Sequence, residues 1–318
     1  MILHYKASAA GPYHIRKGIP CQDSCAVKHT EDFMIGVVAD GVGSQIHSDI
    51  GSGIGAKVSA AFCAEHLKKG MTDDEIRKIM NNAFVYAYQA ILEEADKMQV
   101  YAHDTTLCMG VYDGSTLYYF QSGDSGIVAL LMDGSYTEVT SQQRDEEDRV
   151  FPLCSGPDHW EFGKVENVAS VMLMTDGVLE EVCHPWLKNE AVKINVPLVS
   201  LFMARQGTPE ADVEKLEAAA QQLLELYPEN RLDDDKTVVV LWNNDCVPAV
   251  REESYYEEPD WMALQRKNMT GLYDEPEEEV LPDKEDVVQP EKPFRTGRRR
   301  KKKEKKKKRA KKKAHMKR

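Results

Sequence analysis

The chain has 318 residues with a formal net charge of −12, and 42% of them are hydrophobic, which is enough for a sizeable core and excludes a wholly disordered protein. No run reaches the roughly 18 apolar residues of a membrane-spanning helix, and we expect no secretory signal because no basic start precedes an apolar stretch. The seven cysteines are scattered without a C-x-x-C or zinc-binding spacing, so we expect a reduced, cytoplasmic protein.

Residues 1–242 are predicted to form one folded domain. Its strands are expected in apolar runs bounded by Gly, Asp and Ser, namely 33–39, 107–112, 116–121, 127–132, 168–175 and 237–242. The turn sequences Asp-Gly-Ser at 113–115 and 133–135 separate consecutive runs and are typical of hairpins. The runs therefore predict an antiparallel meander. The charged run Arg144–Arg149 (RDEEDR) is interpreted as a solvated face.

Three helices are expected from the spacing of apolar residues. The first covers 49–69, which is rich in glycine and alanine. The second covers 72–98 and opens with Thr72 three residues before Glu75, the pattern of a capping box. The third starts at 208–209, where proline suits the first helical position. Strands combined with a pair of long helices predict a layered sandwich.

The rest of the chain divides into two segments of opposite charge. Residues 243–294 contain 15 acids, 5 bases and six prolines and are expected to be a largely disordered linker, with 261–273 as a candidate docking segment. Residues 295–318 contain 17 Lys and Arg against one acid, Glu304, and are expected to be a disordered tail because like charges repel. Without aromatic residues among its charges, the tail is expected to bind polyanions such as nucleic acid or an anionic membrane, or the acidic linker itself.

The main functional signal is a set of aspartates at the ends of predicted strands. Asp40 and Asp176 each follow an almost wholly apolar run and precede glycine, Asp124 follows 116–121, and Asp23 and Asp234 precede apolar runs. Each alone is a common turn residue, but such strands end near one another when they pair, and their carboxylates would then converge. Clustered carboxylates without His or Cys suit Mg²⁺ or Mn²⁺, and a pair of such ions is used in phosphoryl transfer.

Six motifs in chain order resemble the metal-dependent PPM/PP2C family of serine/threonine protein phosphatases, in its compact bacterial type. They are QDS (22–24), VVADGVGS (37–44), HDTT (103–106), SGDSG (122–126), MTDGV (174–178) and DDDKTVVV (233–240). The resemblance implies an α+β fold, a four-layer α-β-β-α sandwich with two antiparallel sheets. It also implies hydrolysis of phosphoserine and phosphothreonine by a water that bridges two Mn²⁺ or Mg²⁺ ions. Phosphorylated proteins would be the substrates, a Ser/Thr kinase would oppose the enzyme, and the chain would be a monomer.

The resemblance assigns metal ligands to individual residues. Asp40 would bridge the two ions, and the carbonyl of Gly41 would bind the second. Asp176 and Asp234 would complete the first site, and Asp23 would hold metal-bound water. A weaker third ion would lie between Asp176 and a further acid, Asp124. Two threonines of the HDTT motif, at 105–106, would support the site from a strand.

The chain departs from the family's pattern at the residue that grips the phosphate. The family's arginine lies five residues before the first motif's aspartate, where this chain has Gly18. Lys17 or Arg16 would replace it, or phosphate binding would be weaker. Five other departures remove no direct metal ligand: Gln22, Val42, Ser44, Gly126 and Asp235.

Two other functions compete with the phosphatase. The missing arginine favours a catalytically weak module that binds phosphoproteins as a regulator. The basic segment 295–318 favours a protein whose purpose is anchorage to nucleic acid or membrane. The complete set Asp40, Asp176 and Asp234 argues for the enzyme, with the tail as its localising element.

Overall fold

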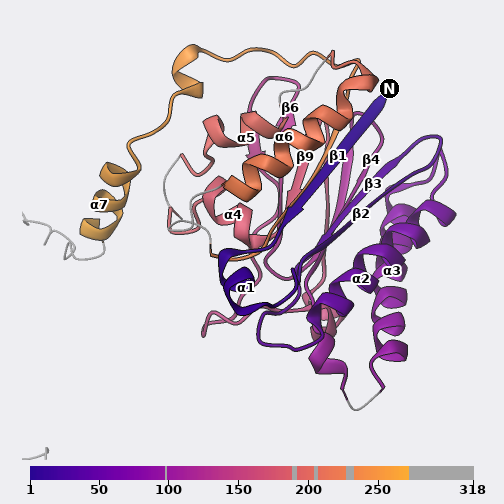
Figure 1. Ribbon diagram of the computed structural model, residues 1–318. Helices are drawn as coiled ribbons and strands as arrows, with labels where there is room; N and C mark the ends of the chain where they lie inside the picture. Colours follow the sequence, from indigo (N-terminus) through magenta and orange to yellow (C-terminus); the bar gives the residue numbers. More distant parts are fainter. Residues whose placement is uncertain (97–98, 188–191, 204–206, 227–232, 272–318) are drawn as a thin grey trace, which may run out of the picture. The chain divides into compact units, whose positions relative to one another are not determined.

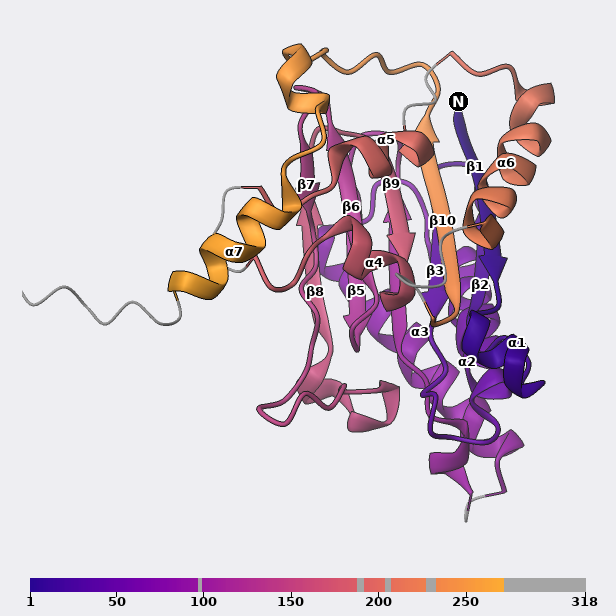
Figure 2. The same cartoon turned by 60° about the vertical axis from the view of Figure 1, so that its left-hand side comes forward.

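A computed structural model of the chain describes residues 1–96, 99–187, 192–203, 207–226 and 233–271. Within the unit Met1–Leu272, two five-stranded antiparallel sheets stack face to face, and helices cover both outer faces (Figures 1 and 2). This arrangement confirms the predicted four-layer α-β-β-α sandwich. The unit Tyr273–Arg318, with the expected polybasic tail and the end of the expected linker, lies outside the described residues.

The first sheet has the strand order β1-β10-β9-β6-β7. These strands are β1 (Ile2–Ala9), β10 (Lys236–Asn243), β9 (Val168–Met174), β6 (Gly126–Leu131) and β7 (Tyr136–Glu138). Its outer face is covered by α4 (Asp176–Val182), α5 (Val196–Met203) and α6 (Val213–Leu226). Along β10, Val238 and Val240 pack on the helices, whereas Val239 and Leu241 pack between the sheets. A strand with this alternation is buried on both faces, which explains its continuous apolar sequence.

The second sheet has the strand order β2-β3-β4-β5-β8. These strands are β2 (Ser24–His29), β3 (Met34–Ala39), β4 (Leu107–Tyr112), β5 (Leu117–Ser122) and β8 (Glu161–Val165). Two long helices cover it, α2 (Ser48–His66) and α3 (Asp73–Glu94). Thr72 and Glu75 form the predicted capping box at the start of α3, each side chain accepting the other's backbone N–H. The short helix α1 (Pro12–Lys17) follows β1.

The predicted meander is correct for two hairpins and wrong for the connection between them. β4 pairs with β5 across the turn at 113–115, and β6 pairs with β7 across the turn at 133–135. β5 and β6, however, belong to different sheets. The chain crosses between the sheets through Gly123, whose φ of +107° favours glycine, and Asp124 lies at this crossing.

The expectation that the strands before Asp40 and Asp176 pair with each other is also wrong. Asp40 follows β3 of one sheet, and Asp176 follows β9 of the other. The two strands face each other across the sandwich, where Val38 and Leu173 share the core between the sheets. The aspartates meet because two stacked sheets end at the same edge.

The first part of the expected linker makes defined contacts with the sandwich. The hydroxyl of Tyr255 accepts a hydrogen bond from the N–H of Tyr136 in β7. The candidate docking segment contains α7 (Trp261–Gly271), where Trp261 contacts the ring of His184 edge-on. Within the described ranges, no helix has the length and apolar character needed to cross a membrane.

Candidate metal centre

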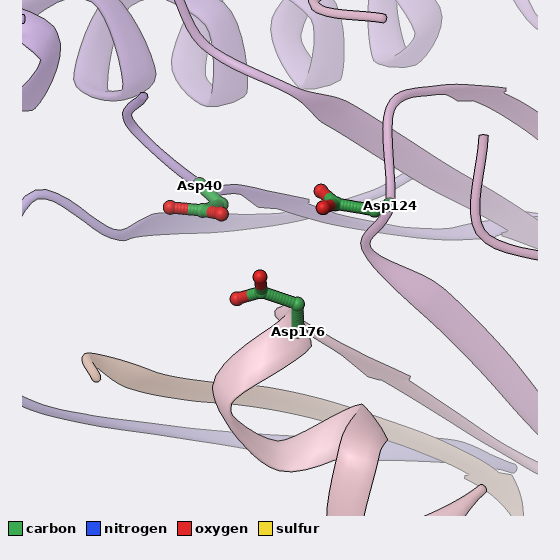
Figure 3. Close-up of side chains that lie close together, drawn as sticks. All are labelled: Asp40, Asp124 and Asp176. Carbon is green, nitrogen blue, oxygen red and sulfur yellow. The ribbon is translucent and has the colours of Figure 1, made fainter. Parts of the chain in front are cut away.

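Three carboxylates from separate parts of the fold converge at one end of the sandwich. Asp40 follows β3, Asp124 lies at the crossing between the sheets, and Asp176 is the first residue of α4. Each offers an oxygen within 4.8 Å of oxygens of the other two, and Figure 3 shows the side chains pointing toward one another. The structure therefore brings together three of the aspartates that the sequence singled out.

The backbone of Asp40 is held by two threonines that precede β4. The hydroxyl of Thr106 accepts the N–H of Asp40 at 3.0 Å, and the N–H of Thr106 donates to the carbonyl of Asp40 at 2.7 Å. The hydroxyl of Thr105 donates to the same carbonyl at 2.9 Å. Three hydrogen bonds thus fix the direction in which the Asp40 side chain leaves the sheet. Their arrangement fits the supporting role expected for these threonines.

Gly41 lies where no side chain fits. A Cβ at this position would come within 2.7 Å of the carbonyl oxygen of Gln22. The N–H of Gly41 donates to that same oxygen at 3.1 Å. The residue after Asp40 is therefore glycine because the 22–23 segment lies directly against its backbone.

The carboxyl groups of the cluster hold their protons unusually tightly. Burial, followed by the charge of Asp176, raises the pKa of Asp40 well above its usual value. Burial, followed by the charge of Asp124, does the same to the pKa of Asp176. Burial also raises the pKa of Asp23 to about 7, although the hydroxyl of Thr175 donates to this carboxylate at 2.7 Å and opposes the shift. The protein alone thus supplies too little positive charge to keep all these groups ionised.

Asp234 lies at the exposed edge of the centre. It is not part of the group of three, but its charge contributes to the raised pKa values of Asp40 and Asp176. Its own carboxylate accepts the N–H of Asp235 at 2.8 Å. Asp234 therefore interacts with the cluster through its charge, and its role as a metal ligand stays a prediction.

The loop that carries Asp234 is anchored by the next residue, Asp235. This buried carboxylate accepts the backbone N–H groups of Gly11 and Gln22, both at 2.6 Å, and lies 2.9 Å from Nδ1 of His14. From the sequence, Asp235 stood out only as a departure from the family. Its signal was an acid just before the apolar run 238–242, because a carboxylate that is buried there requires partners.

Two glycines lie directly against the backbone of the same loop. A Cβ at Gly177 would clash with the carbonyl oxygen of Asp235. A Cβ at Gly11 would clash with the backbone of Asp234. Backbone packing therefore determines the position of the loop, and with it the distance between Asp234 and the start of α4.

One cation at the centre was not foreseen, and the interpretation of 144–149 as a uniformly solvated face is wrong for Arg144. The Nη2 of Arg144 lies 2.7 Å from Oδ2 of Asp124 and 3.4 Å from Oδ2 of Asp176, and only 25% of the side chain is exposed. Burial opposes the charge of Arg144, but the carboxylates outweigh it and raise its pKa. Arg149, at the other end of the run, is 71% exposed as expected.

The two cations predicted to bind phosphate lie on α1, away from this group. Arg16 forms a two-pronged hydrogen bond to Asp233 at 2.8 and 3.0 Å, with half of each side chain exposed. The ammonium of Lys17 lies 6.0 Å from the centre of the Tyr13 ring. Gly18 ends α1 with a φ of +66°, a conformation that favours glycine over arginine.

The donor set of this end of the sandwich fits a hard divalent cation. Asp40, Asp124 and Asp176 offer only oxygen, the ligand that Mg²⁺ and Mn²⁺ prefer. The Oδ1 of Asp124 is buried and has no hydrogen-bond partner among the described residues. The buried oxygen has no donor, and the raised pKa values show that the carboxylates have too little positive charge around them. A bound cation or its water would supply both the charge and the donor.

Comparison with known proteins agrees with this geometry. A sequence profile described as protein phosphatase 2C matches residues 10–225. Serine/threonine-protein phosphatase 3 of Escherichia coli strain K12 is 26% identical over 269 residues, which span 74% of this chain and 96% of that protein.

Solved structures share the fold at low sequence identity. A point variant of a bacterial serine phosphatase is 12% identical with a TM-score of 0.54, covering 79% of this chain and all of that one. The serine/threonine phosphatase of S. agalactiae is 16% identical with a TM-score of 0.53, covering 76% of this chain and 99% of that one. These similarities support the two-sheet architecture.

Proposed function

The chain belongs to the protein phosphatase 2C family and is a protein serine/threonine phosphatase; we propose that it hydrolyses phosphoserine and phosphothreonine at a centre of two divalent ions. The observation that carries this proposal is the convergence of Asp40, Asp124 and Asp176 from three separate elements. Phosphorylated proteins are the substrate class that the family implies.

The proposal assigns tasks to four acids of the centre. Asp40, Asp176 and Asp234 would hold the ions, together with the carbonyl of Gly41. Two bound Mn²⁺ or Mg²⁺ ions would lower the pKa of a shared water and neutralise the oxygens of the phosphate. Asp23, whose Oδ2 accepts a hydrogen bond from the hydroxyl of Thr175, would orient that water by accepting a hydrogen bond from it.

The phosphate of the substrate is proposed to meet the basic side of α1. This helix is tied to the Asp234 loop, because the N–H of Tyr13 donates to the carbonyl of Asp233 at 3.2 Å. Arg16 and Lys17 therefore lie on a helix that is hydrogen-bonded to the loop with a proposed ligand. Their exposure leaves both within reach of a substrate that approaches the open edge of the centre.

The proposal is tested by turnover of p-nitrophenyl phosphate and a phosphothreonine peptide with Mn²⁺ and with a chelator. We expect metal-dependent hydrolysis that is lost in Asp40→Ala and Asp176→Ala. Asp133→Asn, in the exposed turn between β6 and β7, should retain activity. Activity without metal would refute the assigned centre. Tight peptide binding without turnover would instead favour the phosphoprotein-binding module.

We also propose that residues 295–318 bind polyanions and localise the enzyme, on the basis of their 17 basic residues. A chain that lacks them should keep peptide turnover and lose retention on heparin or anionic vesicles. Undiminished retention would contradict this role, and a large loss of turnover would show that the segment belongs to the active unit. An opposing kinase, a monomeric state and a cytoplasmic location stay predictions.

A further inference from the structure

Arg144 lies where the sequence resemblance implies a weaker third metal ion. That ion would share Asp124 and Asp176, and the Nη2 of Arg144 lies 2.7 Å from the first carboxylate and 3.4 Å from the second. The same nitrogen is 3.7 Å from Oε1 of Glu180, and Nη1 is 3.5 Å from Oδ2 of Asp148. A single guanidinium thus faces four acids.

The backbone of the loop also holds Arg144 at this place. The N–H of Gln143 donates to the carbonyl of Gly123 at 3.1 Å, and the side chain of Gln143 accepts the N–H of Gly123 at 3.0 Å. Arg144 itself forms a bridge to Val150, which closes a small hairpin. Since Gly123 immediately precedes Asp124, the loop and the carboxylate that Arg144 contacts are fixed to the same residue.

The position of the guanidinium leaves little room for a cation between the two carboxylates. An ion bound by both Asp124 and Asp176 would lie next to a charge that is already hydrogen-bonded to Asp124. Like charges this close in a partly buried site repel strongly. A third ion therefore binds only if Arg144 leaves.

We propose that Arg144 takes the place of a third metal ion, so that the centre holds two divalent ions and one tethered guanidinium. This inference rests on the proposed metal-dependent function. Arg144 acts as a positioning residue, because it fixes one oxygen of Asp124 and leaves Oδ1 of that carboxylate free of protein donors in the described part of the chain. It also lowers the negative charge of the cluster before any ion binds.

The number of bound ions tests the inference directly. Mn²⁺ binding is measured by calorimetry and by the electron paramagnetic resonance signal of free Mn²⁺, in the full chain and in Arg144→Gln. We expect two ions in the full chain and three in Arg144→Gln, so that any third binding event in the full chain is at least about tenfold weaker than the third one in Arg144→Gln. The double variant Arg144→Gln/Asp124→Asn should return to two.

Arg149→Gln is the matched control. It removes the same charge from the same hairpin, but the ion pairs of Arg149 among the described residues are with Asp145 and Glu147, outside the group of three. This variant should bind two ions as the parent does.

The other outcomes overturn the inference. If the parent binds three ions with the same Mn²⁺ affinities as Arg144→Gln, Arg144 does not compete with a third ion. Two ions in both proteins would show that losing Arg144 opens no further site. If Arg144→Gln does not fold, the ion count of the parent is a sufficient test. A third ion bound to the parent at micromolar Mn²⁺ would then contradict the inference. Absence of Mn²⁺ binding in the folded parent would refute the metal centre itself, so the two failures are distinguishable.

Discussion

Two basic regions of the molecule, one on α1 and one in the hairpin at 142–151, differ in how their side chains are held. On the α1 side, Arg16 pairs with one exposed acid, Asp233, and half of its side chain meets solvent. On the side of the 142–151 hairpin, Arg144 is three-quarters buried against candidate ligands. Arg16 lies close in sequence to the first motif, whereas Arg144 lies in a charged run without any motif. The contrast shows that burial among carboxylates, rather than closeness to a motif, determines which cation belongs to the centre.

The same contrast separates two neighbouring acids of the Asp234 loop and gives the largest expected effect. Asp235 is buried and accepts two backbone N–H groups, whereas Asp233 is exposed and pairs with Arg16. Asp235→Ala should destabilise the fold by about 4 kcal/mol, because hydrogen bonds to a buried charge contribute roughly 1.5–3 kcal/mol each. The melting temperature should fall by roughly 10 °C. Asp233→Ala is the control and should cost less than about 1 kcal/mol. Equal losses of stability in the two variants would contradict the distinction between the buried Asp235 and the exposed Asp233.

The pH dependence of stability sharpens the contrast between buried and exposed carboxyls. The pKa of Asp23 is raised to about 7, so the folded state binds this proton more tightly than the unfolded chain does. The contribution of this proton to the free energy of unfolding is fully present below about pH 4 and is lost as the pH rises through about 7. In chelator, we expect the melting temperature to fall by about 5 °C between pH 5.5 and 8.

Two further measurements identify the source of that pH dependence. Mn²⁺ should raise the melting temperature more at pH 8 than at pH 5.5, because it replaces the protons on the cluster. Asp23→Asn should reduce the slope measured in chelator. If the melting temperature of the parent protein in chelator does not change with pH, the carboxyls are not desolvated together.

The smallest expected effect concerns the exposed cations of α1. Removing both charges in Arg16→Gln/Lys17→Gln should raise KM for a phosphothreonine peptide about fivefold with kcat nearly unchanged, since exposed pairs contribute little. The double variant Lys68→Gln/Lys69→Gln, in the turn that follows α2, is the matched control for charge. If only kcat falls, Arg16 and Lys17 do not bind the phosphate of the substrate.

The buried strands of the fold were predictable from sequence to within one or two residues. The run 107–112 coincides with β4, and 33–39 differs from β3 by one residue, because apolar runs ended at sharp turn residues. The strand β1 was missed because it contains no continuous apolar run. Its ILHYKASA sequence instead alternates polar and apolar residues, as in a strand with one buried face, and it pairs with β10 at the edge of its sheet. Asp40, Asp124 and Asp176 were correctly expected to converge, but for the wrong reason, since the strands before Asp40 and Asp176 lie in different sheets.

Arg144 could not have been found from local sequence. Arg144 and Arg149 flank the same four acids, and nothing in the run distinguishes them. The difference arises from the hydrogen bonds between Gln143 and Gly123, which join the hairpin to a turn 20 residues earlier in the chain. Such a contact depends on how the two sheets stack, which periodicity and motif spacing do not encode.

The central claim is that separate aspartates gather to hold two neighbouring divalent ions. Anomalous diffraction from crystals of the full chain soaked in Mn²⁺ tests it most directly. We predict two adjacent peaks that share Asp40 as a ligand, with Asp176 on one of them and the Arg144 guanidinium still on Asp124. Peaks that avoid Asp40, or a single isolated peak, would contradict the account.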